Sequence, residues 1–178
     1  MRHMLALILS AALALPAAAG PGSEPAPPVV VAEVARLEWG VFCALQAMDR
    51  APAPGTASGW IHVPKGEVSF HWPDRQVVPA ALGLAFGVKV TGAKGWETAV
   101  GEVRVYRPGR TTPESWASDI SSLGATLAFF RFDTESELVP GTWVIEGWDR
   151  DRRLYRVEFE VVPGAAVPEI TNACGATS

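Results

Sequence analysis

The chain has 178 residues, of which 48% are hydrophobic, 19% charged and 9% aromatic. This composition excludes intrinsic disorder, which requires low hydrophobicity and high net charge. The formal net charge of -4 argues against a nucleic-acid partner, because phosphate binding needs a basic surface.

The first residues predict an export signal at positions 1–19. Arg2 and His3 form a basic start, residues 4–15 are almost entirely apolar, and three alanines at 17–19 suit a signal peptidase. The apolar run is shorter than the ~20 residues that span a bilayer, so we expect cleavage rather than the alternative, a retained anchor. No other segment looks able to cross a membrane. We therefore expect an exported protein of the periplasm or the extracellular medium.

Residues 20–33 begin with the Pro-rich sequence GPGSEPAPP, which predicts an extended linker. The length corresponds to one domain. We place that domain at 34–163, where the strand-like patterning lies, and a C-terminal tail at 164–178.

Alternation of apolar and polar residues predicts half-buried strands at 36–41, 84–91, 102–106 and 155–161. Weaker strand candidates are 59–63, 67–72, 126–132 and 142–148. The sequence Thr112-Pro113 predicts the start of a short helix that Gly124 would end. The pattern as a whole predicts an all-β, antiparallel, immunoglobulin-like β-sandwich of about seven to nine strands with at most one short helix. A closed barrel is the alternative.

The chain contains two cysteines, Cys43 and Cys174. In an exported protein, an even pair without metal-ligand spacing predicts a disulfide. Two free buried thiols are the alternative. The chain has no C-x-x-C pair, so we do not expect disulfide-exchange catalysis.

Three stretches carry a family resemblance: LEWGVFC (37–43), VPAALGLAFGVKV (78–90) and RFDTESELVPGTWVIEGWDRDRRLYRVEFEVV (131–162). Together they resemble a family of exported bacterial domains of unknown function. Arg153 stands where we expect a lysine. The resemblance implies an immunoglobulin-like sandwich in the bacterial envelope, and it transfers no catalytic residue.

Motifs for known chemistry are scarce, since H-E-x-x-H, G-x-S-x-G, S-x-x-K and P-loop sequences are missing. His62, His71 and Asp74 would supply three zinc ligands if the strands predicted at 59–63 and 67–72 lay side by side. Two edge-strand histidines without a metal are the simpler interpretation. We expect no cofactor and no metal.

Three carboxylates, Asp133, Glu135 and Glu137, are spaced two residues apart. On an extended chain they would share one face, where they could act in acid–base chemistry or bind calcium. A solvated strand end, partly neutralised by Arg131, is the alternative that we favour.

The seven tryptophans are the least ordinary feature of the composition. We expect Trp39, Trp143 and Trp148 in the core. The other four fall at strand ends or in connections, where exposed rings can bind sugars or a protein partner: Trp60, Trp72, Trp96 and Trp116. Rings that instead cap the ends of the sandwich are the structural alternative.

The sequence therefore predicts an exported, disulfide-stabilised module that binds an envelope protein or polysaccharide, or has a structural role, and is not an enzyme. The candidate binding residues are Trp60, Trp72, Trp96 and Trp116, with His71 and Asp74 at the rim. The alternative is a small hydrolase or metal-binding protein that uses Asp133, Glu135 and Glu137, or His62 and His71.

Overall fold

The computed structural model describes residues 24–174. The predicted export signal at 1–19 lies outside the described residues. So do the first residues of the predicted linker and the last four residues of the chain.

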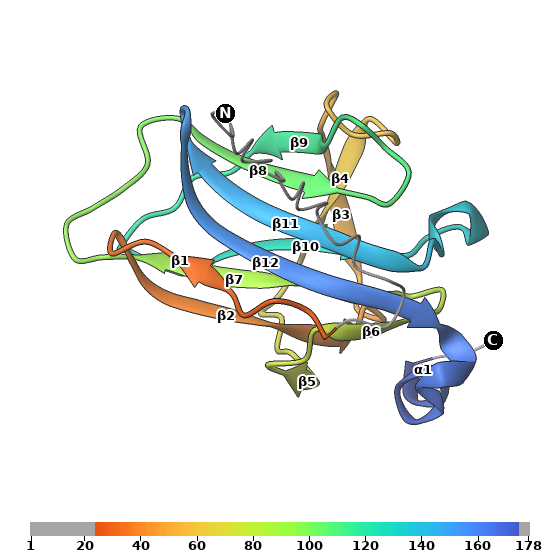
Figure 1. The fold of residues 1–178 in the computed structure, drawn as a ribbon. Helices are drawn as coiled ribbons and strands as arrows, with labels where there is room; N and C mark the ends of the chain where they lie inside the picture. The colour runs from red at the N-terminus through yellow and green to blue at the C-terminus, as the bar shows by residue number, and fades with distance from the viewer. Residues whose placement is uncertain (1–23, 175–178) are drawn as a thin grey trace, which may run out of the picture.

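Two sheets face each other and enclose the core (Figure 1). The first sheet has the strand order β1 (Val29–Val30), β12 (Arg152–Pro163), β11 (Gly141–Asp149), β8 (Gly101–Tyr106) and β9 (Glu114–Ala117), with β6 (Val77–Ala80) also beside β12. The second has the order β10 (Thr126–Arg131), β7 (Leu84–Gly92), β2 (Val34–Cys43) and β5 (Trp72–Pro73). A separate hairpin joins β3 (Met48–Pro52) to β4 (Trp60–Pro64).

Every strand pair is antiparallel except β6 with β12. Neither sheet closes on itself within the described range, so the predicted immunoglobulin-like sandwich is confirmed and the barrel is excluded. The structure has more strands than the seven to nine predicted, because it includes short segments such as the two-residue β1 and β5.

The strands predicted by alternation form as expected where one face is buried. In β12, residues 155, 157, 159 and 161 are buried and the residues between them are half-buried, and β8 alternates in the same way. Their inner side chains meet an aromatic cluster at the centre of the core, in which ring centroids lie 4.9 to 5.8 Å apart. Its members are Phe86, Phe132, Trp143 and Phe159, all fully buried.

Part of the outer face of the second sheet is also covered. On its outer face Phe42 and Ala85 form a small second core with Val68, and the ring of Phe70 lies 6.0 Å from that of Phe42. The prediction of a strand at 67–72 is therefore wrong for residues 67–71. This segment pairs with no strand and instead covers the outer face of the second sheet.

The helix predicted from Thr112 is also wrong. Residues 114–117 form β9, in which Glu114 pairs with Val105 and Trp116 with Val103. The Thr-Pro sequence is a local helix-start signal, and long-range pairing with β8 overrides it. The α-helix of the described chain is α1 (Pro168–Cys174), in the tail.

The predicted disulfide is confirmed. Cys43, at the end of β2, is bonded to Cys174 of α1, with Cα atoms 5.2 Å apart and a sequence separation of 131. Ile170 and Cys174 of α1 are buried in the main core. The bond therefore fastens the tail to the sandwich.

Candidate functional site

The β3–β4 hairpin crosses the other strands at a steep angle beside β9 (Figure 1). At its tip, the Ser115 N–H donates to the Gly55 carbonyl (3.0 Å) and the Ala57 N–H donates to Oε2 of Glu114 (3.1 Å). Glycine is required at position 55, because a Cβ there would overlap the Ser115 carbonyl. These contacts fix the tip against the edge of the first sheet.

The middle of β4 is joined to the end of the second sheet at β10. Nε2 of His62 lies 2.7 Å from Oδ2 of Asp133, which follows β10 closely, and Nε of Arg131 lies 2.9 Å from Oδ1 of the same carboxylate. The imidazole also stacks on Phe129, with centroids 6.4 Å apart. The hairpin thus bridges the two sheets at one side of the sandwich.

Between the two bridges lies a cleft of about 140 Å³. Four aromatic rings line it: Trp60 from the hairpin, Trp116 from β9, and Phe129 and Phe130 from β10. Its polar and charged lining residues are Thr56, Ser58, His62, Glu114, Arg131, Asp133, Thr134 and Glu137. Small clefts with aromatic walls and a few fixed polar groups are typical of ligand sites.

A buried ion pair positions Glu114 under this cleft. Nη1 of Arg107 lies 2.6 Å from Oε1 of Glu114, and both side chains are at most 10% exposed. The guanidinium also lies over the rings of Phe130 and Trp143, 5.2 and 5.0 Å from their centroids. Such pairs are costly to break because the remaining charge stays buried.

The three-carboxylate face predicted at 133–137 is wrong. Residues Glu135–Glu137 form a 3₁₀ helix, η1, so the chain is not extended there, and Asp133 and Glu137 line the cleft while Glu135 does not. Oε2 of Glu137 accepts from the N–H groups of Asp133 (2.7 Å) and Thr134 (2.9 Å). Thr-x-x-Glu is a capping-box sequence, and this local signal would have indicated a helical turn.

The histidines of the predicted metal site do not meet. β4 pairs with β3, and β5, which follows His71, pairs with β2, so the expected neighbouring strands do not form. Nδ1 of His71 accepts from the Cys43 N–H (3.3 Å), and His71 and Asp74 are exposed, away from the cleft. From residue 24 to 174, no group of three or more His, Cys, Asp or Glu side chains is arranged to hold a metal ion.

The four tryptophans proposed for binding separate into two kinds. Trp60 and Trp116 share the cleft, although sequence reasoning could not predict that they meet. Trp72 and Trp96 do not line it; like Trp116, they pack against the main core as partly buried side chains. The first pair therefore remains the candidate.

Of the tryptophans expected in the core, Trp143 is fully buried and Trp39 is half-buried against the core. The prediction for Trp148 is wrong. Its half-buried ring carries the Arg104 guanidinium 4.3 Å from its centroid, and Nε1 donates to Glu146 (2.9 Å). Trp148 lies an odd number of residues after the core-facing Trp143 in the same strand, so regular alternation places its ring on the outer face beside Glu146.

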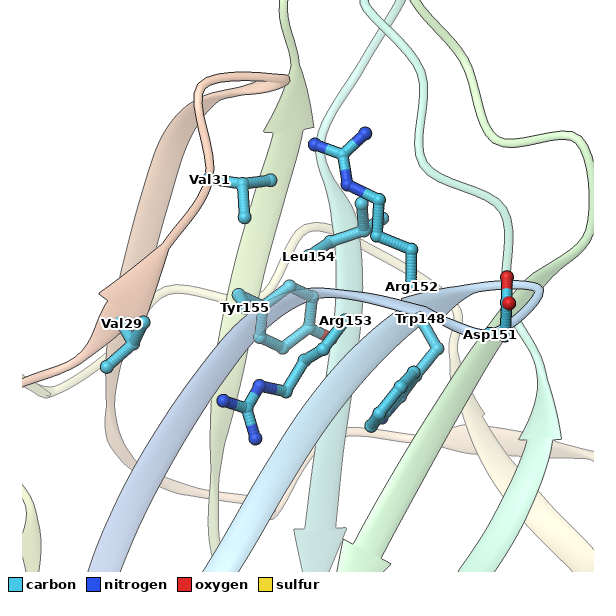
Figure 2. Close-up of a pocket in the computed structure, with 8 residues that line it drawn as sticks. All are labelled: Val29, Val31, Trp148, Asp151, Arg152, Arg153, Leu154 and Tyr155. Carbon is cyan, nitrogen blue, oxygen red and sulfur yellow. The ribbon is translucent and has the colours of Figure 1, made fainter.

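A second, wider hollow lies beside the β11–β12 turn (Figure 2). Its volume is about 580 Å³. Arg152 and Arg153 project in opposite directions there (Figure 2), and each is paired: Nη2 of Arg152 with Glu33 (2.5 Å) and Nη1 of Arg153 with Glu146 (3.0 Å). The hydrogen bond from Arg152 lowers the pKa of Glu33. Both arginines at this hollow therefore already have partners in the protein.

Comparisons with known proteins identify no family. No protein-family model matches the chain, and no curated protein matches it. Among solved structures, an immunoglobulin-like protein from Pseudomonas aeruginosa is similar at 18% identity and a TM-score of 0.47, over 77% of this chain and 98% of that one. The resemblance to exported bacterial domains stays a prediction. In the part of the chain that the structure describes, no helix is long and apolar enough to span a bilayer.

Proposed function

We propose that this protein is an exported binding module that holds a sugar ring of an envelope polysaccharide in the cleft beside the β3–β4 hairpin. One observation carries the proposal: Trp60 and Trp116, on separate elements, line the same small cleft together with hydroxyl and carboxylate groups. Indole rings combine a large apolar surface with a polar N–H group. This combination suits a ligand that has both C–H faces and hydroxyl edges.

The unused hydrogen-bonding groups of the cleft also suit hydroxyls, which both donate and accept. Within residues 24–174 no hydrogen bond is made by Nε1 of Trp60 or Trp116, or by Oε1 of Glu137. A hydroxyl-bearing ring can therefore accept from the indoles and donate to the carboxylate.

The carboxylates favour binding over proton transfer. Glu114 accepts from Arg107 and from the Ala57 N–H, and Asp133 is shared by His62 and Arg131. Both carboxylates are therefore already engaged by partners within the protein, whereas a general acid or base has to face the reacting group of a substrate. These contacts support a recognition site rather than a hydrolase.

Export is supported by the disulfide, since such bonds persist in oxidising compartments and are rare in the cytosol. The predicted signal at 1–19 and the first part of the linker predicted at 20–33 belong to this proposal; Val29–Val30, near the end of that stretch, form β1 of the first sheet instead. We therefore expect that the protein released from a cell envelope fraction has its first residue close to position 20.

Affinity electrophoresis of the mature protein tests the binding proposal. Native gels containing soluble neutral, acidic or N-acetylated bacterial polysaccharides should retard the wild type in at least one case. Trp60→Ala and Trp116→Ala should each weaken retardation at least about tenfold, because truncating an aromatic anchor at the centre of a site costs about 2 kcal/mol or more.

Trp96→Ala is the matched control, because Trp96 is also half-buried but lies outside the cleft. It should bind like the wild type. Thermal melting shows that each variant is folded, and Trp116→Phe replaces Trp116→Ala if the latter unfolds. Equal retardation of all three tryptophan variants would place binding elsewhere, and a wild type retarded by no polysaccharide would overturn the proposal.

A further inference from the structure

The three carboxylates that line the cleft differ in whether the protein supplies them with a cation. Glu114 is paired with Arg107, and Asp133 is paired with Arg131. The third, Glu137, forms no ion pair within the part of the chain that the structure describes. Glu137 is therefore the carboxylate of the cleft that is left for a charged group of a ligand.

The contacts that hold Glu137 in place are with uncharged groups. Its Oε2 accepts from the backbone N–H groups of Asp133 (2.7 Å) and Thr134 (2.9 Å). These contacts fix the side chain at the cleft without neutralising its charge. Beside aromatic walls, where less water screens it, such a charge attracts a cation more strongly than it does in open solvent.

The aromatic rings of the cleft differ in a similar way. Trp60 and Phe130 each have an arginine over the ring, 3.8 and 5.2 Å from the ring centroid, and Phe129 is stacked on a histidine. No arginine or lysine lies over Trp116 in residues 24–174. Tryptophan is the aromatic side chain that attracts a cation best, so Trp116 is the second group that the protein leaves for a positively charged ligand.

We infer that the cleft prefers a sugar ring that carries a free amino group over the same ring with that group acetylated. This inference rests on the proposed function and names the class of sugar. A protonated amine is attracted both by an indole face and by a carboxylate, and it offers three hydrogen-bond donors. An acetamide is neutral and offers one donor, so acetylation weakens both attractions.

Isothermal titration calorimetry with two soluble tetrasaccharides tests this inference. The tetramers of glucosamine and of N-acetylglucosamine, joined by the same linkage, differ in their acetyl groups alone. At neutral pH the mature wild-type protein should bind the glucosamine tetramer at least about fivefold more tightly, because hydrogen bonds to charged groups are stronger than those between neutral groups.

Equal affinities for the two tetramers would overturn the preference for an amine, and so would a glucosamine tetramer that does not bind. The proposed function is tested separately, by retardation in polysaccharide gels that depends on Trp60 and Trp116. Retardation of that kind without a preference for the amine would contradict this inference and leave the proposed function intact. Absence of retardation would overturn the proposed function itself.

Glu137→Gln assigns the preference to the cleft. Glutamine keeps an oxygen that accepts the two backbone hydrogen bonds, and Thr-x-x-Gln is also a capping-box sequence, so η1 should still form. The ratio of the two affinities should fall towards one in this variant. An unchanged ratio in Glu137→Gln, shown to be folded by thermal melting, would contradict the inference.

Glu135→Gln is the matched control. It removes the same charge two residues away, from an exposed side chain that does not line the cleft, so its ratio should equal that of the wild type. A fall of the same size in both variants would show a general attraction between an acidic protein and a cationic sugar. That result would overturn the assignment to Glu137 and to the cleft.

Discussion

The cleft beside β3–β4 and the hollow beside the β11–β12 turn both combine tryptophan, arginine and carboxylate side chains, yet the two are held in different ways. Around the cleft, Arg107 and Glu114 are almost completely buried and the hairpin is hydrogen-bonded at its tip and in the middle of β4. Around the hollow, Arg152 and Arg153 are about half exposed, at 53% and 43%. The smaller space therefore has the more deeply buried arginine beside it. Volume alone would select the hollow, whereas the burial of the supporting charges, on which our proposal depends, selects the cleft.

The largest expected effect comes from breaking the buried pair behind the cleft. Arg107→Ala should lower the free energy of unfolding by about 3–5 kcal/mol, because it leaves the Glu114 carboxylate buried without its cation. Chemical denaturation at neutral pH measures this change. Arg104→Ala is the control on the hollow side, where a half-exposed arginine over Trp148 pairs with Glu102. It should cost about 0–1 kcal/mol, and similar losses for both variants would break the comparison.

The two tyrosines of the chain give an intermediate effect that depends on pH. Burial raises the pKa of Tyr155, which packs over Gly147 in the core. The pKa of Tyr106, on the outer face, is raised mainly by desolvation and further by the nearby Glu146 carboxylate. The neutral phenol is therefore favoured by the fold, so its contribution to stability is complete below the ordinary tyrosine pKa of about 10 and is lost as pH rises above it. Absorbance at alkaline pH should show Tyr106 ionising first and Tyr155 only as the protein unfolds. Tyr106→Phe assigns the first step, and a reversible two-tyrosine step in the folded protein would contradict the expected order.

The smallest expected effect belongs to the exposed pair of Glu33 and Arg152 at the hollow. The hydrogen bond from Arg152 lowers the pKa of Glu33, so any stabilisation is present above the ordinary glutamate pKa and is lost as pH falls through the lowered value. Solvent screening keeps this contribution small. Glu33→Gln should leave the thermal midpoint at neutral pH unchanged within error. As the pH is lowered, the midpoint of the variant should fall slightly less than that of the wild type. A large drop in the midpoint would show that the hollow is held as firmly as the cleft.

Local patterns predicted the parts of the fold that local chemistry determines. Alternation identified β8 and β12 because one face of each strand is buried and the other is partly exposed to solvent. The same approach failed at 67–71 and 114–117, where packing on Phe42 and pairing with β8 decide the structure. Both depend on residues distant in sequence.

The candidate site was predictable by residue type but not by arrangement. Trp60 and Trp116 were chosen as amphipathic rings outside the regular strands, and Trp72 and Trp96 met the same criterion equally well. What separates the two pairs is the position of the β3–β4 hairpin, which depends on contacts such as His62 with Asp133. The Thr134-x-x-Glu137 capping box was the one local signal at the site that could have been read in advance.

The bond between Cys43 and Cys174 has a consequence for survival among proteases. All strands from β3 to β12 lie between these two residues in sequence, so a single cut in any surface loop of that range opens the chain without separating the fragments. The exposed turn at 149–152 is one such place. A nicked molecule would migrate as one species until a reductant is added, and its two pieces would stay in register around the same core.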